Sequence, residues 1–265
     1  MSATEQSRGF GVAAGLDPAI AAPLAARCEE LGYSSMWSND HPMASGLETL
    51  AAFAEGSERL ELGVAVAALD RHRPGELAAR IGALGLDAGR LWLGIGAGFS
   101  ERPLSAINDA LPALREALPG IRLVLAAMGP RMCALAGSAF EGAFLNWVTP
   151  ESAHEARRHV HEGAAQAGRE PPPVFGYVRV AVGPDAEARL LKEESFYRNL
   201  HDGYRRQFAR LGAGPGTVGA AHREPDDVAR ALEAYDALDV IVARGLASAS
   251  LEAMGAVAAA AAPRR

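Results

Sequence analysis

The residues best suited to chemistry stand directly after short apolar runs. Asn39, Asp40 and His41 follow the run at residues 34–38, and Pro42 comes next. A carboxylate beside an imidazole can fix one histidine tautomer or accept a proton. Asn, Asp and Pro also favour tight turns, so a plain strand-to-loop turn is the competing interpretation.

A second candidate segment joins an apolar run to a predicted helix. It comprises Met128, Gly129, Pro130 and Arg131, after the run at residues 121–127. Glycine lets a ligand approach the backbone, and proline at the first helical position gives up no useful donor. The free N–H groups and the dipole of a helix N-terminus suit a phosphate, and Arg131 can add a bidentate contact. An ordinary helix start is the competing interpretation.

Three glycines, Gly94, Gly96 and Gly98, alternate along the apolar run at residues 90–98. Glycine weakens a strand unless another group must come close to it. A flat ring lying on this backbone and close packing inside a barrel both satisfy that condition. Basic residues stand after or near the ends of three further runs, where they meet either an anionic group or solvent: Arg71, His72, Arg73, Arg179 and Arg244.

Several classes of chemistry lack the residues they need. Lys192 is the only lysine, and it lies in the polar run LLKEE. Schiff-base and pyridoxal phosphate enzymes need a lysine in an apolar site, and a Walker loop needs one after glycine. No HExxH, CxxC or GxSxG occurs, and Cys28 and Cys133 stand far apart. We therefore predict no metal site, no disulfide framework and no nucleophile-elbow hydrolase.

Short strand-like runs alternate with longer helical patterns along the chain. The eight predicted strands are residues 10–15, 34–40, 59–69, 90–98, 121–128, 142–148, 173–183 and 239–246, and one long helical stretch covers residues 185–211. Strict alternation predicts an α/β fold, a single (β/α)8 TIM barrel formed by residues 1–265. In such barrels the active site lies at the C-terminal ends of the strands, where the candidate residues stand.

Composition is that of an ordinary globular protein. The chain has 265 residues, 49% hydrophobic and 22% charged, and a net charge of −6. The negative charge argues against a nucleic-acid partner. The first residues lack a signal-peptide pattern, and the alanine-rich stretch at 256–262 is too short to span a bilayer. We therefore expect a cytoplasmic protein without a membrane partner.

Five segments, in their order and spacing, resemble the luciferase-like monooxygenase superfamily. They read ELGYSSMWSNDHP (residues 30–42), SERLELGVAVAALDRHRP (57–74), GRLWLGIGAG (89–98), LAAMGPRMCALAG (125–137) and EGAFLNWVTPE (141–151). This superfamily of barrels includes bacterial luciferase and the reductases and dehydrogenases that use the deazaflavin coenzyme F420. The resemblance covers most of residues 9–151 and rests mainly on element order beyond them.

The resemblance implies a barrel that holds a flavin-type ring at the C-terminal ends of its strands. In F420-dependent members the third strand carries a non-proline cis peptide, and the matching bond here is Ala65–Val66. The implied cofactor-binding residues are Asp40, His41, Ala65, Val66, Ala67, Gly96, Ala97, Gly98, Ala127, Met128, Gly129, Pro130 and Arg131. The implied substrate pocket comprises Asn39, Phe99, Asn146 and Trp147.

The resemblance favours a reductase that passes a hydride between F420 and an electron-poor double bond or carbonyl of a small or peptide-like substrate. His41 is then the first candidate for proton donation, with Asp40 orienting it. Phe99 stands where F420-dependent sugar-phosphate dehydrogenases carry an acidic proton donor, and Glu101 is the nearest acid. The segment at residues 99–120, between the fourth and fifth strands, is also shortened, which predicts a more open cofactor mouth.

Two alternatives stay open. An FMN-dependent monooxygenase of the same superfamily needs a closed, dry pocket, and the shortened segment argues mildly against one. A non-catalytic flavin-binding barrel would explain the missing acid. Because family members often pair through barrel helices, the resemblance also implies a homodimer.

Overall fold

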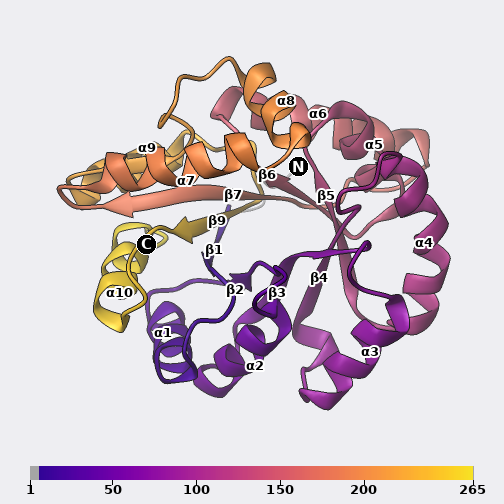
Figure 1. Cartoon of the computed structure of the whole chain (residues 1–265), viewed down its shortest axis with the longest axis horizontal. Coiled ribbons are helices and arrows are strands. Elements are labelled where there is room, and N and C mark those ends of the chain that lie inside the picture. Colours follow the sequence, from indigo (N-terminus) through magenta and orange to yellow (C-terminus); the bar gives the residue numbers. More distant parts are fainter. Residues whose placement is uncertain (1–5, 265) are drawn as a thin grey trace.

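Eight parallel strands close into a barrel at the centre of the molecule, and the helices lie outside it (Figure 1). The structure is a computed structural model that describes residues 6–264, so residues 1–5 and 265 of the predicted barrel domain lie outside the described residues. Neighbouring strands follow the chain order, and pairing of β9 with β1 completes the ring, which confirms the predicted TIM-barrel fold. The barrel strands are β1 (Ser7–Val12), β2 (Ser35–Ser38), β3 (Glu61–Ala68), β4 (Leu91–Gly96), β5 (Arg122–Ala127), β6 (Gly142–Asn146), β7 (Val174–Val182) and β9 (Val240–Gly245).

Many of the outer helices begin at a proline. The missing N–H of proline costs nothing at the first helical position, because that group has no partner within the helix. Within residues 6–264, no helix is both long and apolar enough to cross a membrane. The helices are α1 (Pro18–Glu30), α2 (Gly46–Gly56), α3 (Pro74–Ala83), the short 3₁₀ helix η1 (Ala88–Arg90), α4 (Pro103–Ala117), α5 (Pro130–Ala139), α6 (Pro150–Gln166), α7 (Ala186–Leu200), α8 (Asp202–Leu211), α9 (Pro225–Glu233) and α10 (Leu251–Ala260).

The region between β7 and β9 differs from the prediction of one long helical stretch at residues 185–211. The stretch breaks at His201, whose backbone is extended and whose ring nitrogen Nδ1 accepts a hydrogen bond from Gly203 N at 3.0 Å. This side chain therefore ends α7 and caps the start of α8. The sequence analysis also missed a three-residue strand, β8 (Ala220–His222), because an element of three residues shows no periodicity. It missed the nine-residue helix α9 that follows as well.

Strand β7 extends beyond the end of its neighbour β6 and changes partner along its length. It pairs with β6 as far as Tyr177, and from Val180 to Val182 it pairs with β8 instead. Its other edge pairs with β9 from Phe175 to Val180. Strand β6 therefore closes the barrel wall along the N-terminal part of β7, and β8 continues the sheet outward along its C-terminal part. We call this change of partner the β6–β8 seam.

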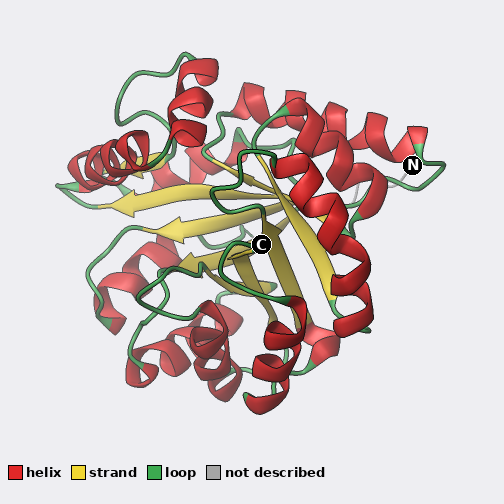
Figure 2. Ribbon diagram, turned by 45° about the vertical axis from the view of Figure 1, so that its right-hand side comes forward, coloured by secondary structure: helices red, strands yellow, loops and turns green. Residues whose placement is uncertain are grey.

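Aromatic side chains fill the inside of the barrel, which Figure 2 shows as yellow strands enclosed by red helices. The ring of Trp37 lies 4.8 Å from that of Phe144 and 5.3 Å from that of Phe175, centroid to centroid. Tyr177 packs against Phe144 at 4.8 Å, and Trp92 packs against Phe175 at 4.9 Å. Side chains thus occupy the barrel interior, as is usual for this fold, and a ligand must bind at an end of the barrel.

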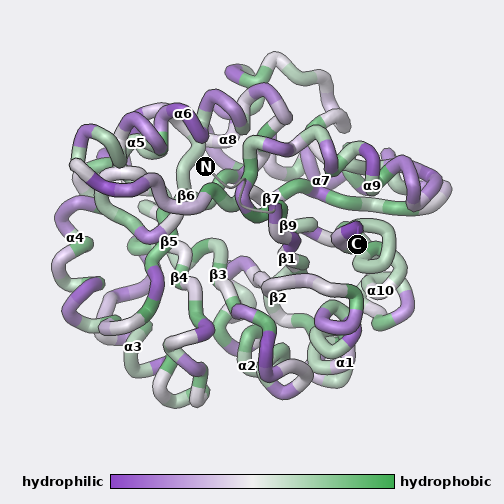
Figure 3. Tube along the Cα trace, turned by 180° about the vertical axis from the view of Figure 1, so that it is seen from behind, coloured by the Kyte–Doolittle hydropathy of each residue, from purple (hydrophilic) through white to green (hydrophobic). Residues whose placement is uncertain are grey.

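A larger hydrophobic core lies between the barrel and the helices. Outward-facing strand residues such as Phe10 and Val64 pack there against helix residues such as Leu24 and Leu50. Figure 3 shows the same division along the chain, since β7 carries the colour of hydrophobic residues and α8 is largely hydrophilic. The helix layer therefore shields the barrel wall and leaves the strand ends free for binding.

The aromatic filling predicts a severe penalty for adding one methyl group opposite Trp37. A Cβ at Gly63 would lie 2.1 Å from the Trp37 ring, whereas one at Gly82, on exposed helix α3, would meet no atom within 4 Å. We expect Gly63→Ala to lower stability by about 1–3 kcal/mol and Gly82→Ala to raise it by about 0.5–1 kcal/mol. Thermal melting checks both, and equal melting temperatures for the two variants would contradict this packing.

Candidate cofactor and substrate site

The loop after β2 is fixed by the carboxylate of Asp40, whose side chain is only 8% exposed. Its Oδ1 accepts a hydrogen bond from Gly46 N at 3.0 Å. Its Oδ2 lies 2.8 Å from Nε2 of His72 and 3.3 Å from Nη2 of Arg71. Asp40 therefore joins the loop after β2 to the loop after β3.

The expectation that Asp40 orients His41 is wrong in this structure. Nδ1 of His41 accepts a hydrogen bond from Met43 N at 3.2 Å, and a short bridge pairs His41 with Ala44. The two side chains are adjacent in sequence, but the turn sends them to different partners. Asp40 instead uses His72 of the basic cluster after β3. His41 remains half-exposed at the C-terminal ends of the strands, which we call the rim.

Two further polar residues stabilise the rim. Oδ1 of Asn39 accepts a hydrogen bond from Ala14 N, linking the ends of β1 and β2. Asp70 accepts one from Phe99 N at 3.0 Å, linking the ends of β3 and β4. A Cβ at Gly98 would lie 2.1 Å from that carboxylate, and φ at Gly98 is +62°, so glycine is required here for both reasons. Asn39, predicted to line the substrate pocket, thus also has a structural contact.

The bond Ala65–Val66 is a non-proline cis peptide, at the position that the family resemblance implied. Beside it the pairing register of β3 and β4 shifts between Val64 and Ala67. A Cβ at Gly96 would lie 2.8 Å from Cγ2 of Val66, and one at Gly94 would lie 2.4 Å from the carbonyl oxygen of Val64. Both glycines make room for β3, so close packing explains them. A ring against Gly96, Ala97 and Gly98 stays a prediction.

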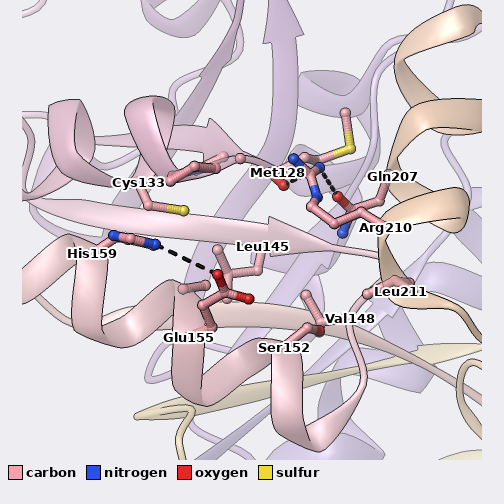
Figure 4. A pocket seen from close by; sticks show the side chains of 14 residues that line it. Met128, Cys133, Leu145, Val148, Ser152, Glu155, His159, Gln207, Arg210 and Leu211 are labelled. Atoms are coloured by element: carbon pink, nitrogen blue, oxygen red, sulfur yellow. Dashed lines mark hydrogen bonds and ion pairs between the residues drawn. The ribbon is translucent and has the colours of Figure 1, made fainter.

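A cleft at the start of α5 contains the segment predicted to hold a cofactor phosphate (Figure 4). Gly129 stands at the N-cap of α5 without a side-chain cap, and Pro130 is the first helical residue. Arg210 of α8 lies across this end, with Nη1 3.2 Å from the position of a Cβ on Gly129. Its Nη2 donates to the carbonyl oxygen of Met128 at 2.6 Å and also contacts Gln207. We call this region the α5 cleft.

The α5 cleft combines residues that the sequence analysis predicted with one that it missed. Ala127, Met128, Gly129 and Pro130 line it, whereas Arg131 is exposed and does not. The arginine that lines the cleft is Arg210, about 80 residues further along the chain, and Glu155 and His159 of α6 also line it. Nothing in the sequence around Arg210 marks it, because its position follows from the way α8 packs across the end of β5.

The ends of β6, β7 and β9 bring together two buried arginines and two predicted pocket residues. Arg179 is 2% exposed, donates a hydrogen bond to Oδ1 of Asn146, and has its Cζ 3.8 Å from the ring centre of Trp147. Burial lowers the pKa of Arg179, and burial also raises the pKa of the nearby Tyr177 hydroxyl. Arg244 of β9 is 8% exposed. An arginine inside an apolar strand run is a signal that sequence analysis can use.

Helices α7 and α8 cover part of the rim. Tyr197 of α7 and Phe208 of α8 pack on Trp147, with ring centres 5.1 and 5.0 Å away. His201, between the helices, lies 4.9 Å from the ring of Phe99, which is 59% exposed. Phe99, predicted to line the substrate pocket, therefore stands at the edge of this cover. Among residues 6–264, no group of three or more His, Cys, Asp or Glu side chains could hold a metal ion.

Comparison with known proteins agrees with this arrangement. A family model described as luciferase-like monooxygenase matches residues 1–118 and 108–261. The chain belongs to the luciferase-like monooxygenase family. One relative, the 5,10-methylenetetrahydromethanopterin reductase of Methanolobus tindarius, is 26% identical over 208 residues. That match covers 64% of this chain and 64% of the relative, so it spans less than two thirds of the relative's length.

Solved structures share the fold across almost the whole chain. A coenzyme F420-dependent tetrahydromethanopterin reductase from Methanopyrus kandleri has a TM-score of 0.74 and 17% identity, covering 97% of each chain. An F420-dependent secondary alcohol dehydrogenase has a TM-score of 0.72 and 15% identity, covering 97% of this chain and 99% of that one. An FMN-containing Baeyer-Villiger monooxygenase from Pseudomonas putida has a TM-score of 0.66 and 15% identity, covering 98% of each. F420 and FMN are thus both found among the structural neighbours.

The two cysteines of this luciferase-like chain are predicted to be unreactive in the folded state. Burial raises the pKa of Cys133 to about 12 and raises the pKa of Cys28 still further above its usual range. Because the thiolate is the nucleophile, about one Cys133 in 10⁴ is reactive at pH 8. We expect a thiol reagent such as dithionitrobenzoate to label neither cysteine at pH 8, with the Cys133 rate rising with pH.

The unfolded chain provides the control for this labelling. In guanidinium chloride both thiols become accessible, and two equivalents should react. Rapid labelling of the folded protein at neutral pH would show that the α5 cleft exposes Cys133, contrary to the structure.

Proposed function

We propose that the protein is a reductase that uses reduced F420. The observation that carries this proposal is the α5 cleft, where an uncapped helix N-terminus faces the guanidinium of Arg210 beside the C-terminal end of β5. A helix N-terminus and an arginine together suit a phosphate, which both F420 and FMN carry. Membership of the luciferase-like family supports a flavin-type cofactor. A structural neighbour named as a coenzyme F420-dependent tetrahydromethanopterin reductase, and a relative named as a methylenetetrahydromethanopterin reductase, support the choice of F420.

The residues present fit a flavin-type cofactor at the rim. Met128, Gly129 and Arg210 would hold its phosphate, and the ends of β2, β3 and β4 would face its ring. When bound, F420 supplies a hydride to an electron-poor double bond or carbonyl. The aromatic filling beneath the rim keeps the reacting groups at the end of the barrel and excludes water from below.

The protein's own part in the reaction is to position groups and to supply a proton. His41 is half-exposed at the rim, and histidine is the residue that enzymes most often use for general acid–base catalysis. Asp40 acts as a positioning residue, because it fixes the loops that carry His41 and His72. The connection from β4 to α4 spans residues 97–102 without a further element, which favours an open mouth and hence a reductase over an oxygenase. The homodimer and the cytoplasmic location stay predictions.

Removal of the Arg210 guanidinium should weaken cofactor binding. A hydrogen bond to a charged group contributes about 1.5–3 kcal/mol, so we expect Arg210→Ala to raise the dissociation constant of F420 by about 10- to 100-fold. Fluorescence titration of the purified protein with F420, and separately with FMN, measures this. Arg206→Ala, on the exposed side of the same helix, is the matched control and should bind like the wild type. Tight FMN binding without F420 binding would reverse the choice of cofactor.

Replacement of His41 should slow the reaction without loss of the cofactor. General acid catalysis contributes about 10²–10⁴-fold, so we expect His41→Ala to lower turnover by that factor, which exceeds any change in the dissociation constant of F420. Glu101→Gln is the comparison variant, because Glu101 is the nearest acid after β4. Unchanged turnover in His41→Ala, with loss in Glu101→Gln, would assign proton donation to Glu101. Absence of turnover by the wild type on any acceptor would favour the non-catalytic barrel.

A further inference from the structure

Two arginines stand side by side on neighbouring strands inside the rim. Arg179 of β7 and Arg244 of β9 are register partners in the parallel pairing of these strands. Both are more than nine-tenths buried, at 2% and 8% exposed. Arg244 leans over β1, since a Cβ at Gly11 would lie 3.5 Å from its Cδ and 2.7 Å from the ring of Tyr177. Both guanidinium groups therefore lie above the aromatic filling of the barrel.

Neither arginine has an acidic partner. In residues 6–264 no ion pair involves Arg179 or Arg244, although Glu193 of α7 influences Arg179 from a distance. Buried charges are normally paired, and like charges directly opposite each other on neighbouring strands destabilise a sheet. Stacking of Arg179 on Trp147 offsets part of that cost for one arginine. Arg244 forms one hydrogen bond, to the carbonyl oxygen of Gly245 at 3.3 Å.

Unused hydrogen-bond donors gather around the pair. Among the described residues, three of the buried polar atoms without a partner belong to this cluster: Tyr177 Oη, Arg179 Nε and Trp147 Nε1. Arg244 adds most of its five N–H donors. All of these groups can donate hydrogen bonds, so the complementary ligand is rich in acceptors and carries negative charge. A surplus of donors of this kind has no structural use in the protein alone.

We propose that Arg179 and Arg244 bind the carboxylate of an anionic substrate. The proposal rests on the proposed function and specifies its substrate class, a small unsaturated or oxo carboxylic acid. Arg244, the more exposed of the two at 8%, donates directly to the carboxylate, and Arg179 beside it on β7 adds positive potential. Guanidinium groups bind carboxylates in a bidentate, charge-assisted geometry, which also fixes the orientation of the substrate.

The arginine pair and the α5 cleft are separate positive sites. The α5 cleft is lined from β5, α5, β6, α6 and α8, and neither Arg179 nor Arg244 lines it. The carboxylates in the tail of F420 are a second source of the same chemistry. The test therefore includes the affinity for F420 itself, which we expect Arg244 variants to leave within twofold of the wild type.

Stability separates a binding role from a structural one. If Arg244 serves a ligand, Arg244→Met removes like-charge repulsion while it keeps the packing of the side chain, and the free protein should melt at the same or a higher temperature. A melting temperature more than about 4 °C below the wild type would show a structural role and overturn the proposal. Arg206→Met, on the exposed side of α8, is the matched control for an arginine-to-methionine change.

Small anions test the site directly. Acetate should raise the melting temperature of the wild type by about 2–4 °C above sodium chloride at equal ionic strength, and acetamide, which has the same shape without charge, should not. Arg244→Met should lose the acetate effect, Arg244→Lys should keep part of it, and Arg206→Met should keep all of it. An equal acetate effect in the wild type and in Arg244→Met, or no acetate effect in the wild type, would overturn the proposal.

The two proposals fail differently. If F420 binds to the wild type and to Arg244→Met alike but acetate makes no difference between them, the substrate class is wrong and the cofactor assignment stands. If acetate distinguishes them but neither F420 nor FMN binds, the anion site stands and the proposed function fails. If Arg244→Met loses F420 affinity tenfold or more, the pair serves the cofactor tail and not a substrate.

Discussion

The close packing of aromatic rings inside the barrel is the constraint on which the rest of the structure depends. Trp37, Trp92, Phe144, Phe175 and Tyr177 occupy the space that eight strands enclose, and glycine faces Trp37 because a methyl group would not fit. Binding and chemistry are thereby confined to the rim. There the backbone leaves the sheet, and the hydrogen bonds between neighbouring strands stop. Polar side chains link the loops of the rim in place of those hydrogen bonds. Asn39, Asp40 and Asp70 each connect neighbouring loops there.

Positive charge at the rim is local and contrasts with the net charge of −6 of the whole chain. Arg210 stands at the start of α5, and the pair Arg179 and Arg244 stands at the ends of β7 and β9. These arginines attract an anion locally, although the chain as a whole is negative. The two positive regions are distinct, because neither Arg179 nor Arg244 lines the α5 cleft, which suits a cofactor and a substrate that are both acidic.

Sequence alone was sufficient for features that depend on local pattern. Alternating strand and helix runs predicted the barrel, and the family resemblance located the cis bond at Ala65–Val66. It was insufficient where distant segments meet. The partner of Asp40 is His72 and not the adjacent His41, because a turn separates neighbours that a sequence shows together. The glycines of β4 are needed because Val66 of the neighbouring strand packs against them, and Arg210 reaches Gly129 from another helix.

The β6–β8 seam gives the barrel mouth one adjustable side. The pairing of β6 with β7 ends at Asn146 and Tyr177, and that of β9 with β7 ends at Val180, so the chain that follows β7 is attached to the scaffold without being needed to close the ring. Segments 183–219, with α7 and α8, can change in length or composition while the ring of strands keeps its register. Changes in this segment can therefore reshape the wall of the mouth beside β7 without a change in strand pairing, provided that α8 keeps Arg210 against Met128.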